Sequence, residues 1–314
     1  MTASAEVALE MQGVSKRFGA LSAVADVSFS VRRGEIFGLV GPDGAGKSTV
    51  MRMLASVMRA DAGRIRIDGV DVVADPETTK RHVSYMPQRF GLYDDLTVDE
   101  NIRFYADLFE VPDALWRARA QQLLEASNML PFRARLAGKL SGGMKQKLGL
   151  TCALVHAPRV LLLDEPTTGV DPLSRREFWQ ILYSLRATGV AMVISTAYLD
   201  EAERCDRLAL LDHGAVMYCD TPHRLKQDMA GAIVRIAAAQ PRALQAALQG
   251  LPGVAGVLLV GDGVHVQVDD GARRVPQLER ALQAAGLAHG APEMVEPSVE
   301  DLFVALLERK AQAA

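Results

Sequence analysis

The sequence has few of the residues that mark disulfide-bonded, zinc-binding or nucleic-acid-binding proteins. Only three cysteines occur among 314 residues, and no two of them form a CxxC pair. This spacing excludes a disulfide framework and a cysteine zinc site, and it favours a reducing compartment. The formal net charge is −3, so there is no basic excess for contact with nucleic acid, and we expect no nucleic-acid partner.

Long apolar segments are also missing. The longest apolar runs, such as 257–260 and 160–163, are far shorter than the roughly 20 residues that a membrane-spanning helix needs. The first ten residues lack the basic stretch and apolar core of a secretory signal. We therefore expect a cytoplasmic chain that reaches a membrane only through a partner, as a peripheral protein on its inner face.

The pattern of apolar residues predicts two domains, as the length favours. In residues 1–228, short apolar runs such as 36–40 and 160–163 alternate with helical segments, which predicts an α/β fold with a mostly parallel sheet. A helix is expected from Lys47 to about Met58, and Thr97 with Glu100 has the spacing of a capping box. Residues 229–314 predict a small α+β domain, ferredoxin-like in its order of strands and helices.

A glycine-rich loop stands between the run 36–40 and the helix expected from Lys47. It reads GPDGAGKS over 41–48 and satisfies the spacing GxxxxGK[ST]. Glycines let backbone N–H groups surround a phosphate, Lys47 would reach the β- and γ-phosphates, and Ser48 would bind Mg²⁺. The alternative is a glycine turn with an exposed lysine. The residues expected to contact the nucleotide are Gly41, Pro42, Asp43, Gly44, Ala45, Gly46, Lys47, Ser48 and Thr49.

Two carboxylates end the apolar run 160–163, in the sequence VLLLDEP. A carboxylate at the carboxyl end of a parallel strand lies at the edge where ligands bind. Asp164 would hold Mg²⁺, and Glu165 would orient and deprotonate the attacking water. The alternative is a helix cap beside a surface acid, and the upstream phosphate loop argues against it.

A third motif, LSGGMKQ over 140–146, opens another predicted helix. Ser141 is a natural N-cap, and Gly142 and Gly143 leave backbone N–H groups accessible to an anion. With these three motifs in this order, the chain over about 7–225 resembles the ATP-binding cassette (ABC) ATPases. The resemblance implies a P-loop NTPase (RecA-like) core with an antiparallel β subdomain and an α-helical subdomain.

The resemblance also implies a two-subunit machine that binds ATP and Mg²⁺. In the family two cassettes enclose two ATP molecules, and the signature residues, here Ser141, Gly142 and Gly143, contact ATP held by the opposite subunit. The partner would be a second copy or another cassette. Phe18 matches the aromatic that stacks on adenine, Gln88 matches the glutamine that senses Mg²⁺ and water, and Asp171 matches an interface aspartate. Ordinary roles remain open for these three, as a core aromatic, a polar loop residue and a helix N-cap.

Two positions depart from the family pattern. Asp43 stands where asparagine is usual and places a carboxylate near the phosphates, which should weaken binding slightly. Ala197, in STAYLDE, stands where the family has its switch histidine. Alanine cannot donate to a phosphate. Tyr198 should point elsewhere, and His213 is expected to be a surface residue in a turn. We expect slowed hydrolysis, unless Glu165 suffices alone or a partner cassette carries the histidine.

The remaining question is which machine the cassette drives. Only 94 positions separate Lys47 from Ser141 (141 − 47), without heptads, so the long coiled coil of chromosome ATPases is missing. Segments 80–107 and 296–303 are similar to ABC-2-type exporter cassettes, whose permeases are separate chains. The alternative is a soluble ABC-type ATPase acting on a nucleic-acid or ribosomal partner. Residues 90–92 should line a groove for the permease, and the C-terminal domain would serve dimerisation, regulation or interface capping.

Overall fold

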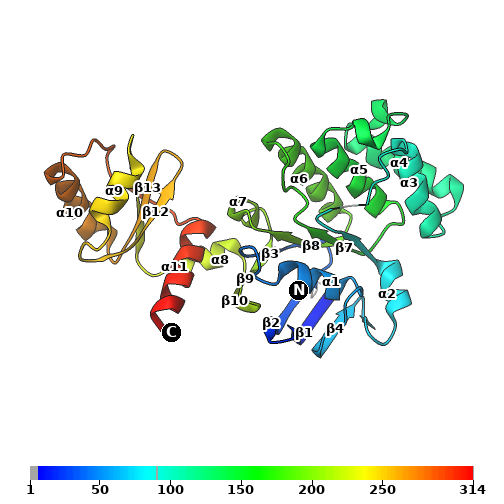
Figure 1. The fold of residues 1–314 in the computed structure, drawn as a ribbon, viewed down its shortest axis with the longest axis horizontal. Coiled ribbons are helices and arrows are strands. Elements are labelled where there is room, and N and C mark those ends of the chain that lie inside the picture. The colour runs from blue at the N-terminus through cyan, green and yellow to red at the C-terminus, as the bar shows by residue number, and fades with distance from the viewer. Residues whose placement is uncertain (1–5, 90, 314) are drawn as a thin grey trace, which may run out of the picture. The chain divides into compact units, whose positions relative to one another are not determined.

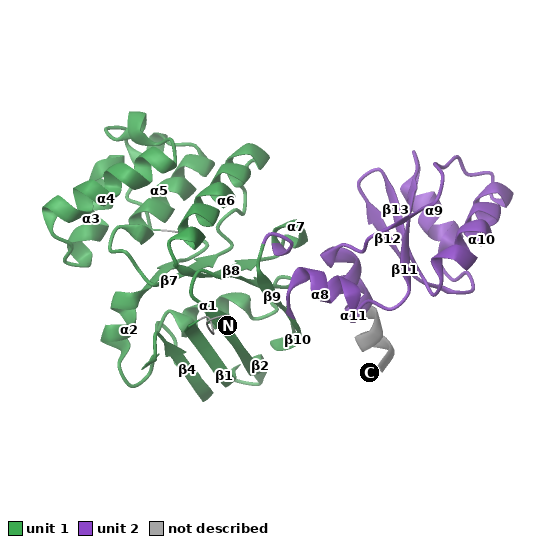
Figure 2. Ribbon diagram, turned by 180° about the vertical axis from the view of Figure 1, so that it is seen from behind, with its two compact units in different colours: residues 1–201, 205–219 green, residues 202–204, 220–314 purple. Residues whose placement is uncertain are grey.

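The structure is a computed structural model that describes residues 6–89 and 91–313, with side chains up to residue 307. The chain divides into two compact units (Figure 2), and each is described by itself. The first comprises 1–201 and 205–219, and the second comprises 202–204 and 220–314. The sequence predicts two functional domains, 1–228 and 229–314, and this domain boundary stays a prediction.

The first unit is built around a six-stranded sheet in the order β10-β9-β3-β8-β7-β6 (Figure 1). Strands β9, β3, β8, β7 and β6 pair in parallel. This confirms the parallel core predicted from the alternation of strands and helices. The strands are β3 (Ile36–Val40), β6 (Val83–Met86), β7 (Val160–Asp164), β8 (Ala191–Thr196), β9 (Arg207–Asp212) and β10 (Ala215–Asp220).

The central strands are apolar throughout because both faces of the sheet are covered. All five residues of β7 are buried. Val160 and Leu162 face one hydrophobic cluster, and Leu161 and Leu163 face another on the opposite side of the sheet. Because side chains alternate between the two faces of a strand, β7 contributes residues to both hydrophobic cores.

The first of these cores lies between the parallel sheet, helix α1 (Lys47–Leu54) and an antiparallel sheet. Helix α1 ends earlier than the expected Met58, because Ser56 adopts a left-handed backbone with φ of 58° that cannot continue a helix. The antiparallel sheet has the order β2-β1-β4-β5. Its strands are β1 (Val7–Phe18), β2 (Leu21–Arg32), β4 (Ala62–Ile67) and β5 (Val70–Asp71).

Helices cover the other face of the parallel sheet and extend into a helical subdomain with its own core. Thr97 and Glu100 form both halves of the capping box at the start of α3, as predicted from their spacing. The remaining helices of this unit are α2 (Pro76–His82), α3 (Val98–Leu108), α4 (Asp113–Ala126), α5 (Gly142–Leu154) and α6 (Pro172–Ala187), with two 3₁₀ turns, η1 (Leu130–Phe132) and η2 (Ala137–Lys139). The short helix α7 (Leu199–Ala202) spans the division between the units.

The second unit contains a four-stranded antiparallel sheet in the order β12-β13-β11-β14. The chain order is β11 (Ala232–Ala237), α9 (Pro241–Leu248), β12 (Val254–Val260), β13 (Gly263–Val268), α10 (Gly271–Ala284) and β14 (Glu293–Val295). This βαββαβ order with a split pairing is the ferredoxin-like arrangement expected from the sequence. Helices α8 (Pro222–Gln227) and α11 (Val299–Ala313) pack together at its start and end.

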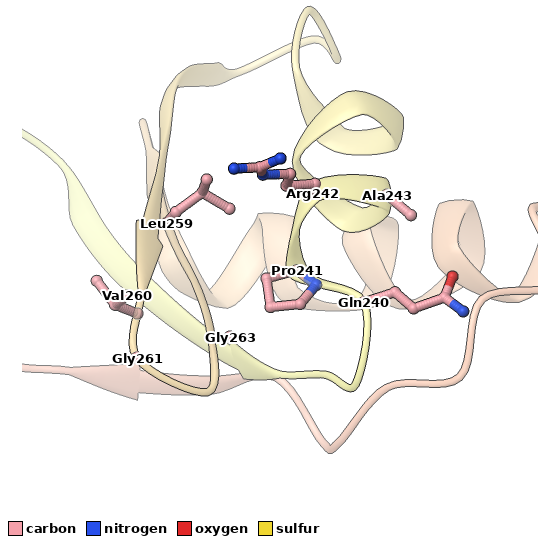
Figure 3. Close-up of a pocket in the computed structure, with 8 residues that line it drawn as sticks. All are labelled: Gln240, Pro241, Arg242, Ala243, Leu259, Val260, Gly261 and Gly263. Atoms are coloured by element: carbon pink, nitrogen blue, oxygen red, sulfur yellow. The ribbon is translucent and has the colours of Figure 1, made fainter.

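A cavity of about 560 Å³ lies in the second unit, between the start of α9 and the hairpin of β12 and β13. Figure 3 shows Arg242 reaching from α9 towards Leu259. The other labelled lining side chains are mostly small or apolar. Within the described ranges, no helix combines the length and the apolar character needed to cross a membrane.

Candidate functional site

Polar residues follow three neighbouring strands at one edge of the parallel sheet. Strand β3 leads into the glycine-rich loop, β7 ends at Asp164, and β8 ends at Thr196. A cavity of about 710 Å³ opens beside the loop, within the range of roughly 300–1,000 Å³ that ligand pockets occupy. Its lining residues are Phe18, Leu21, Ser22, Ala23, Asp43, Gly44, Gly46, Lys47, Ser48, Thr49, Gln88, Glu165 and His213.

The backbone of the loop requires glycine at its close approaches. Gly44 and Gly46 have φ values of 80° and 102°, which L-residues with a side chain rarely adopt. A Cβ atom on Gly46 would lie 2.5 Å from the carbonyl oxygen of Ala23. Gly46 is the N-cap of α1 and offers no side-chain acceptor. The first N–H groups of α1 are therefore available to an anion at the positive end of the helix dipole.

Lys47 places a buried cation at the mouth of this loop. Its side chain is only 4% exposed, and Nζ donates to the carbonyl oxygens of Gly41, at 2.8 Å, and Pro42, at 3.1 Å. The same Nζ lies 3.2 Å from Oε1 of Glu165. Because water is largely excluded here, an arriving phosphate would interact with the ammonium more strongly than it would at the surface.

Asp164 collects three hydroxyl donors on its two oxygens. Ser48 Oγ donates to Oδ1 at 3.1 Å, Ser195 Oγ donates to Oδ1 at 2.5 Å, and Tyr85 Oη donates to Oδ2 at 3.1 Å. Burial, followed by the charge of Asp164, raises the pKa of Tyr85 to about 12, so the phenol keeps its proton at neutral pH. The Ser48 hydroxyl beside a carboxylate is an oxygen pair that fits Mg²⁺.

Glu165 is the second carboxylate of the site. Its backbone has a φ of 48°, and its N–H donates to Ser195 Oγ at 2.9 Å. Gln88 Nε2 donates to Oε2 at 3.0 Å, while Oε1 faces Lys47. A left-handed non-glycine residue costs about 1–3 kcal/mol and persists where its surroundings hold it. The glutamate is thus held at the cavity wall between an amide donor and a cation.

The signature residues and Asp171 lie at the N-termini of two helices, outside the cavity lining. Ser141 caps α5 by accepting from Met144 N at 3.3 Å, and a Cβ atom on Gly143 would lie 2.4 Å from Ser174 Oγ. Asp171 caps α6 by accepting from Ser174 N at 2.9 Å, and this hydrogen bond lowers its pKa. Of the described residues, those that line the cavity do not include Ser141, Gly142, Gly143 or Asp171.

The position expected for the switch histidine carries only a methyl group. Ala197 is exposed and follows β8 directly. The ring of Tyr198 lies under the guanidinium of Arg175, with Cζ 4.4 Å from the ring centroid. Thr196 Oγ1 donates to the buried Glu201 at 2.9 Å. These partners show that the side chains on both sides of Ala197 are engaged away from the cavity.

The rim of the cavity carries one aromatic ring and one imidazole. Phe18, at the end of β1, is 46% exposed and lines the cavity. His213 lies in the turn after β9, and its side chain is 88% exposed. It is a surface turn residue, as expected, and it also lines the cavity.

Two residues that bind the carboxylates were not expected from the sequence, Ser195 and Tyr85. Ser195 joins Asp164 Oδ1 to the backbone of Glu165. Tyr85 reaches Asp164 from the neighbouring strand β6. A polar pair at the end of the apolar run of β8 was a local signal for Ser195. For Tyr85 no such signal exists, because its role depends on which strand lies beside β7.

A glycine-rich loop at a helix start, a buried lysine and two carboxylates at strand ends define a nucleoside-triphosphate-binding P-loop domain. The comparisons agree: the family model "ABC transporter" matches residues 24–168. The probable multidrug ABC transporter ATP-binding protein YbhF of Escherichia coli (strain K12) is 42% identical over 311 residues, which is 96% of this chain and 52% of that protein. The chain thus spans about half the length of that relative.

The doxorubicin resistance ATP-binding protein DrrA of Mycobacterium tuberculosis (strain CDC 1551 / Oshkosh) is 33% identical over 310 residues, covering 96% of this chain and 94% of that protein. A solved structure of an ATP-binding subunit of an ABC transporter has a TM-score of 0.64 and 32% identity, and the match covers 70% of this chain and 92% of that one. The chain belongs to the family of ATP-binding proteins of ABC transporters.

Proposed function

We propose that this chain binds ATP together with Mg²⁺ and hydrolyses it to power a membrane exporter. The observation that carries the proposal is the position of Glu165 beside Gln88 and Lys47 at the wall of the cavity. The similarity to multidrug and doxorubicin resistance ATP-binding proteins supports export. Neither YbhF nor DrrA supports the alternative, an ATPase that acts on a nucleic-acid or ribosomal partner.

The geometry of the site supports a role for each of its parts. The loop 41–49 would enclose the phosphates, with Lys47 against the β- and γ-phosphates and Phe18 stacked on the base. Glu165 would take a proton from the attacking water as the bond between the γ-phosphorus and the bridging oxygen breaks, leaving ADP and phosphate. Ser48, Asp164 and Gln88 would hold Mg²⁺, which neutralises charge on the phosphate oxygens.

The signature residues support a two-subunit arrangement. Ser141, Gly142 and Gly143 open helix α5 with an anion-binding N-terminus, yet they do not line the cavity beside the phosphate loop of their own chain. We propose that they complete the ATP site of a second cassette, either another copy or a paired subunit. Asp171 would lie at that interface. ATP binding would then drive the dimerisation that powers transport.

A second cavity of the first unit, of about 510 Å³, offers a surface for the permease. Val57 and Leu108, two of its lining residues, are 63% and 62% exposed, which is unusual for apolar side chains gathered at one place. We call it the docking cavity; its lining residues are Ala55, Val57, Glu77, Lys80, Arg81, Val83, Tyr85, Leu108, Phe109 and Glu110. We propose that an apolar segment of an ABC-2-type permease on the cytoplasmic face of the membrane occupies it.

The docking cavity is lined by other residues than the permease groove expected from the sequence. A groove for the permease was expected at residues 90–92. Phe90 lies outside the described residues, so that expectation stays a prediction. Leu92 packs against the helical core. For the second unit, dimerisation or regulation stays our proposal for residues 229–314.

Replacing Val57 with aspartate should prevent association with the permease. A carboxylate at position 57 would have to be desolvated when the apolar permease segment covers it. We expect co-purification with a co-expressed permease to fall at least about tenfold, a loss of about 1.4 kcal/mol, while ATP binding is unchanged. Leu115→Asp is the matched control, since Leu115 is also an exposed apolar residue, 43% accessible, outside this cavity. Unaltered co-purification of V57D would contradict the assignment.

Replacing Ala197 with histidine should increase the rate of hydrolysis. A histidine here could donate to the γ-phosphate and hold the attacking water against Glu165. Acid–base groups of this kind contribute up to about 10²–10⁴-fold, and we expect at least about a tenfold rise in phosphate release by the purified chain. Ala197→Leu tests the effect of size alone. If the unmodified chain already turns over at about 1–10³ per second and the histidine adds nothing, the proposed deficiency is wrong.

A further inference from the structure

Tyr85 lies on the wall of the docking cavity. Strand β6 alternates its side chains, so Val83 and Tyr85 share one face of the sheet and both line the cavity. The tyrosine ring packs against the core beneath helix α1 and is only partly buried. A segment that enters the docking cavity would therefore touch this ring.

The other end of the same side chain reaches the nucleotide site. Tyr85 pairs with Leu162 across the parallel strands β6 and β7, and its hydroxyl extends along β7 to Asp164 Oδ2 at 3.1 Å. Oδ1 of Asp164 accepts from Ser48 and Ser195. Within the part of the chain that the structure describes, Tyr85 donates the hydrogen bond to Oδ2. Ser48 and Ser195 hold Oδ1 of Asp164, and the Tyr85 hydroxyl holds Oδ2. The tyrosine therefore fixes the orientation of the Asp164 carboxylate plane.

We propose that Tyr85 is a positioning residue that couples occupation of the docking cavity to the binding of Mg²⁺ and ATP. The inference rests on the proposed function and extends it with a physical link between its two sites. A permease segment against the ring displaces the phenol, and the charge-assisted hydrogen bond to Asp164 weakens or reorients. The metal-binding carboxylate then changes its orientation. By linkage, MgATP changes the affinity of the cavity for the segment by the same factor.

The first test removes only the hydroxyl group. In Tyr85→Phe, the Mg²⁺ concentration that gives half-maximal binding of a fluorescent ATP analogue should change by at least threefold. Tyr105→Phe is the matched control, because Tyr105 is likewise half-buried but its hydroxyl donates to the carbonyl oxygen of Gly91. General damage to the fold would weaken binding in EDTA as well as in Mg²⁺, and would lower the melting temperature. An unchanged Mg²⁺ midpoint in Y85F overturns the proposal.

The second test fills the docking cavity in both backgrounds. Val57→Trp puts an indole at the cavity wall in place of a permease segment, at a position exposed enough to tolerate it. We expect V57W to shift the Mg²⁺ midpoint at least threefold when Tyr85 is present and by less than 1.5-fold in the Y85F background. Equal shifts in both backgrounds, or none in either, overturn the coupling.

These outcomes are separable from those of the proposed function. The measured quantity is binding of the nucleotide analogue, so it does not require hydrolysis. A chain that binds the analogue in Mg²⁺ but releases no phosphate from ATP would overturn the proposed ATPase function, while the two-background comparison would still decide the role of Tyr85.

Discussion

Replacing Glu165 with glutamine is expected to lower phosphate release by the purified chain about 100-fold or more, because a general base contributes roughly 10²–10⁴-fold to such reactions. The amide can still accept a hydrogen bond from Gln88, which donates to Oε2 at 3.0 Å in the structure. It cannot take a proton from water. The change therefore removes the chemistry and leaves the shape of the site.

ATP binding should survive this substitution and become tighter. Glu165 Oε1 lies 3.2 Å from Lys47 Nζ, so its charge competes with a phosphate for the ammonium. Neutralising it leaves Lys47 free for the nucleotide, and we expect ATP to trap a dimer that gel filtration detects. The control is Glu125→Gln on the exposed side of α4. Phosphate release by E165Q within threefold of the unmodified chain would exclude Glu165 as the base.

The parts of the site and of the fold that follow from local sequence could be predicted. The phosphate loop, the strand VLLLD and the capping box at Thr97 each consist of neighbouring residues whose spacing reports the local backbone directly. The split βαββαβ order of the second unit was also predictable, because strands and helices alternate there at short intervals. In all of these, the information lies within a few tens of residues.

Contacts that depend on strand order could not be predicted in this way. Tyr85 and Ser195 both meet Asp164 only because β6 and β8 flank β7, and the chain separates them from it by 79 and 31 positions. Strand β1 continues to Phe18, although the regular alternation of apolar residues in the sequence extends only from Val7 to Met11. Register shifts after Met11, where Gly13 has a φ of 59°, interrupt the alternation that marks a strand.

Replacing Lys47 with alanine is expected to weaken ATP binding about 100-fold, since removing one partner of a buried charge pair costs roughly 2–5 kcal/mol. The ammonium is 4% exposed and bonds the carbonyl oxygens of Gly41 and Pro42, so it both shapes the loop and carries the charge that faces the phosphates. Titration with a fluorescent ATP analogue measures the loss. The phosphate release that depends on binding should fall with it.

Part of the loss of ATP binding in K47A will come from a less stable fold. A substitution at a second buried lysine separates this effect from the loss of the phosphate contact. Lys147 on α5 is 9% exposed at its side chain, pairs with Glu177 at 2.6 Å and donates to the carbonyl oxygen of Ser127. Lys147→Ala should lower the melting temperature as K47A does, because each change removes an ammonium that pairs with a carboxylate and donates to a buried carbonyl oxygen. Lys147 does not line the nucleotide cavity, so its removal should leave ATP affinity within about twofold. If both variants lost affinity equally, unfolding would explain the loss, and the contact between Lys47 and phosphate would have no support.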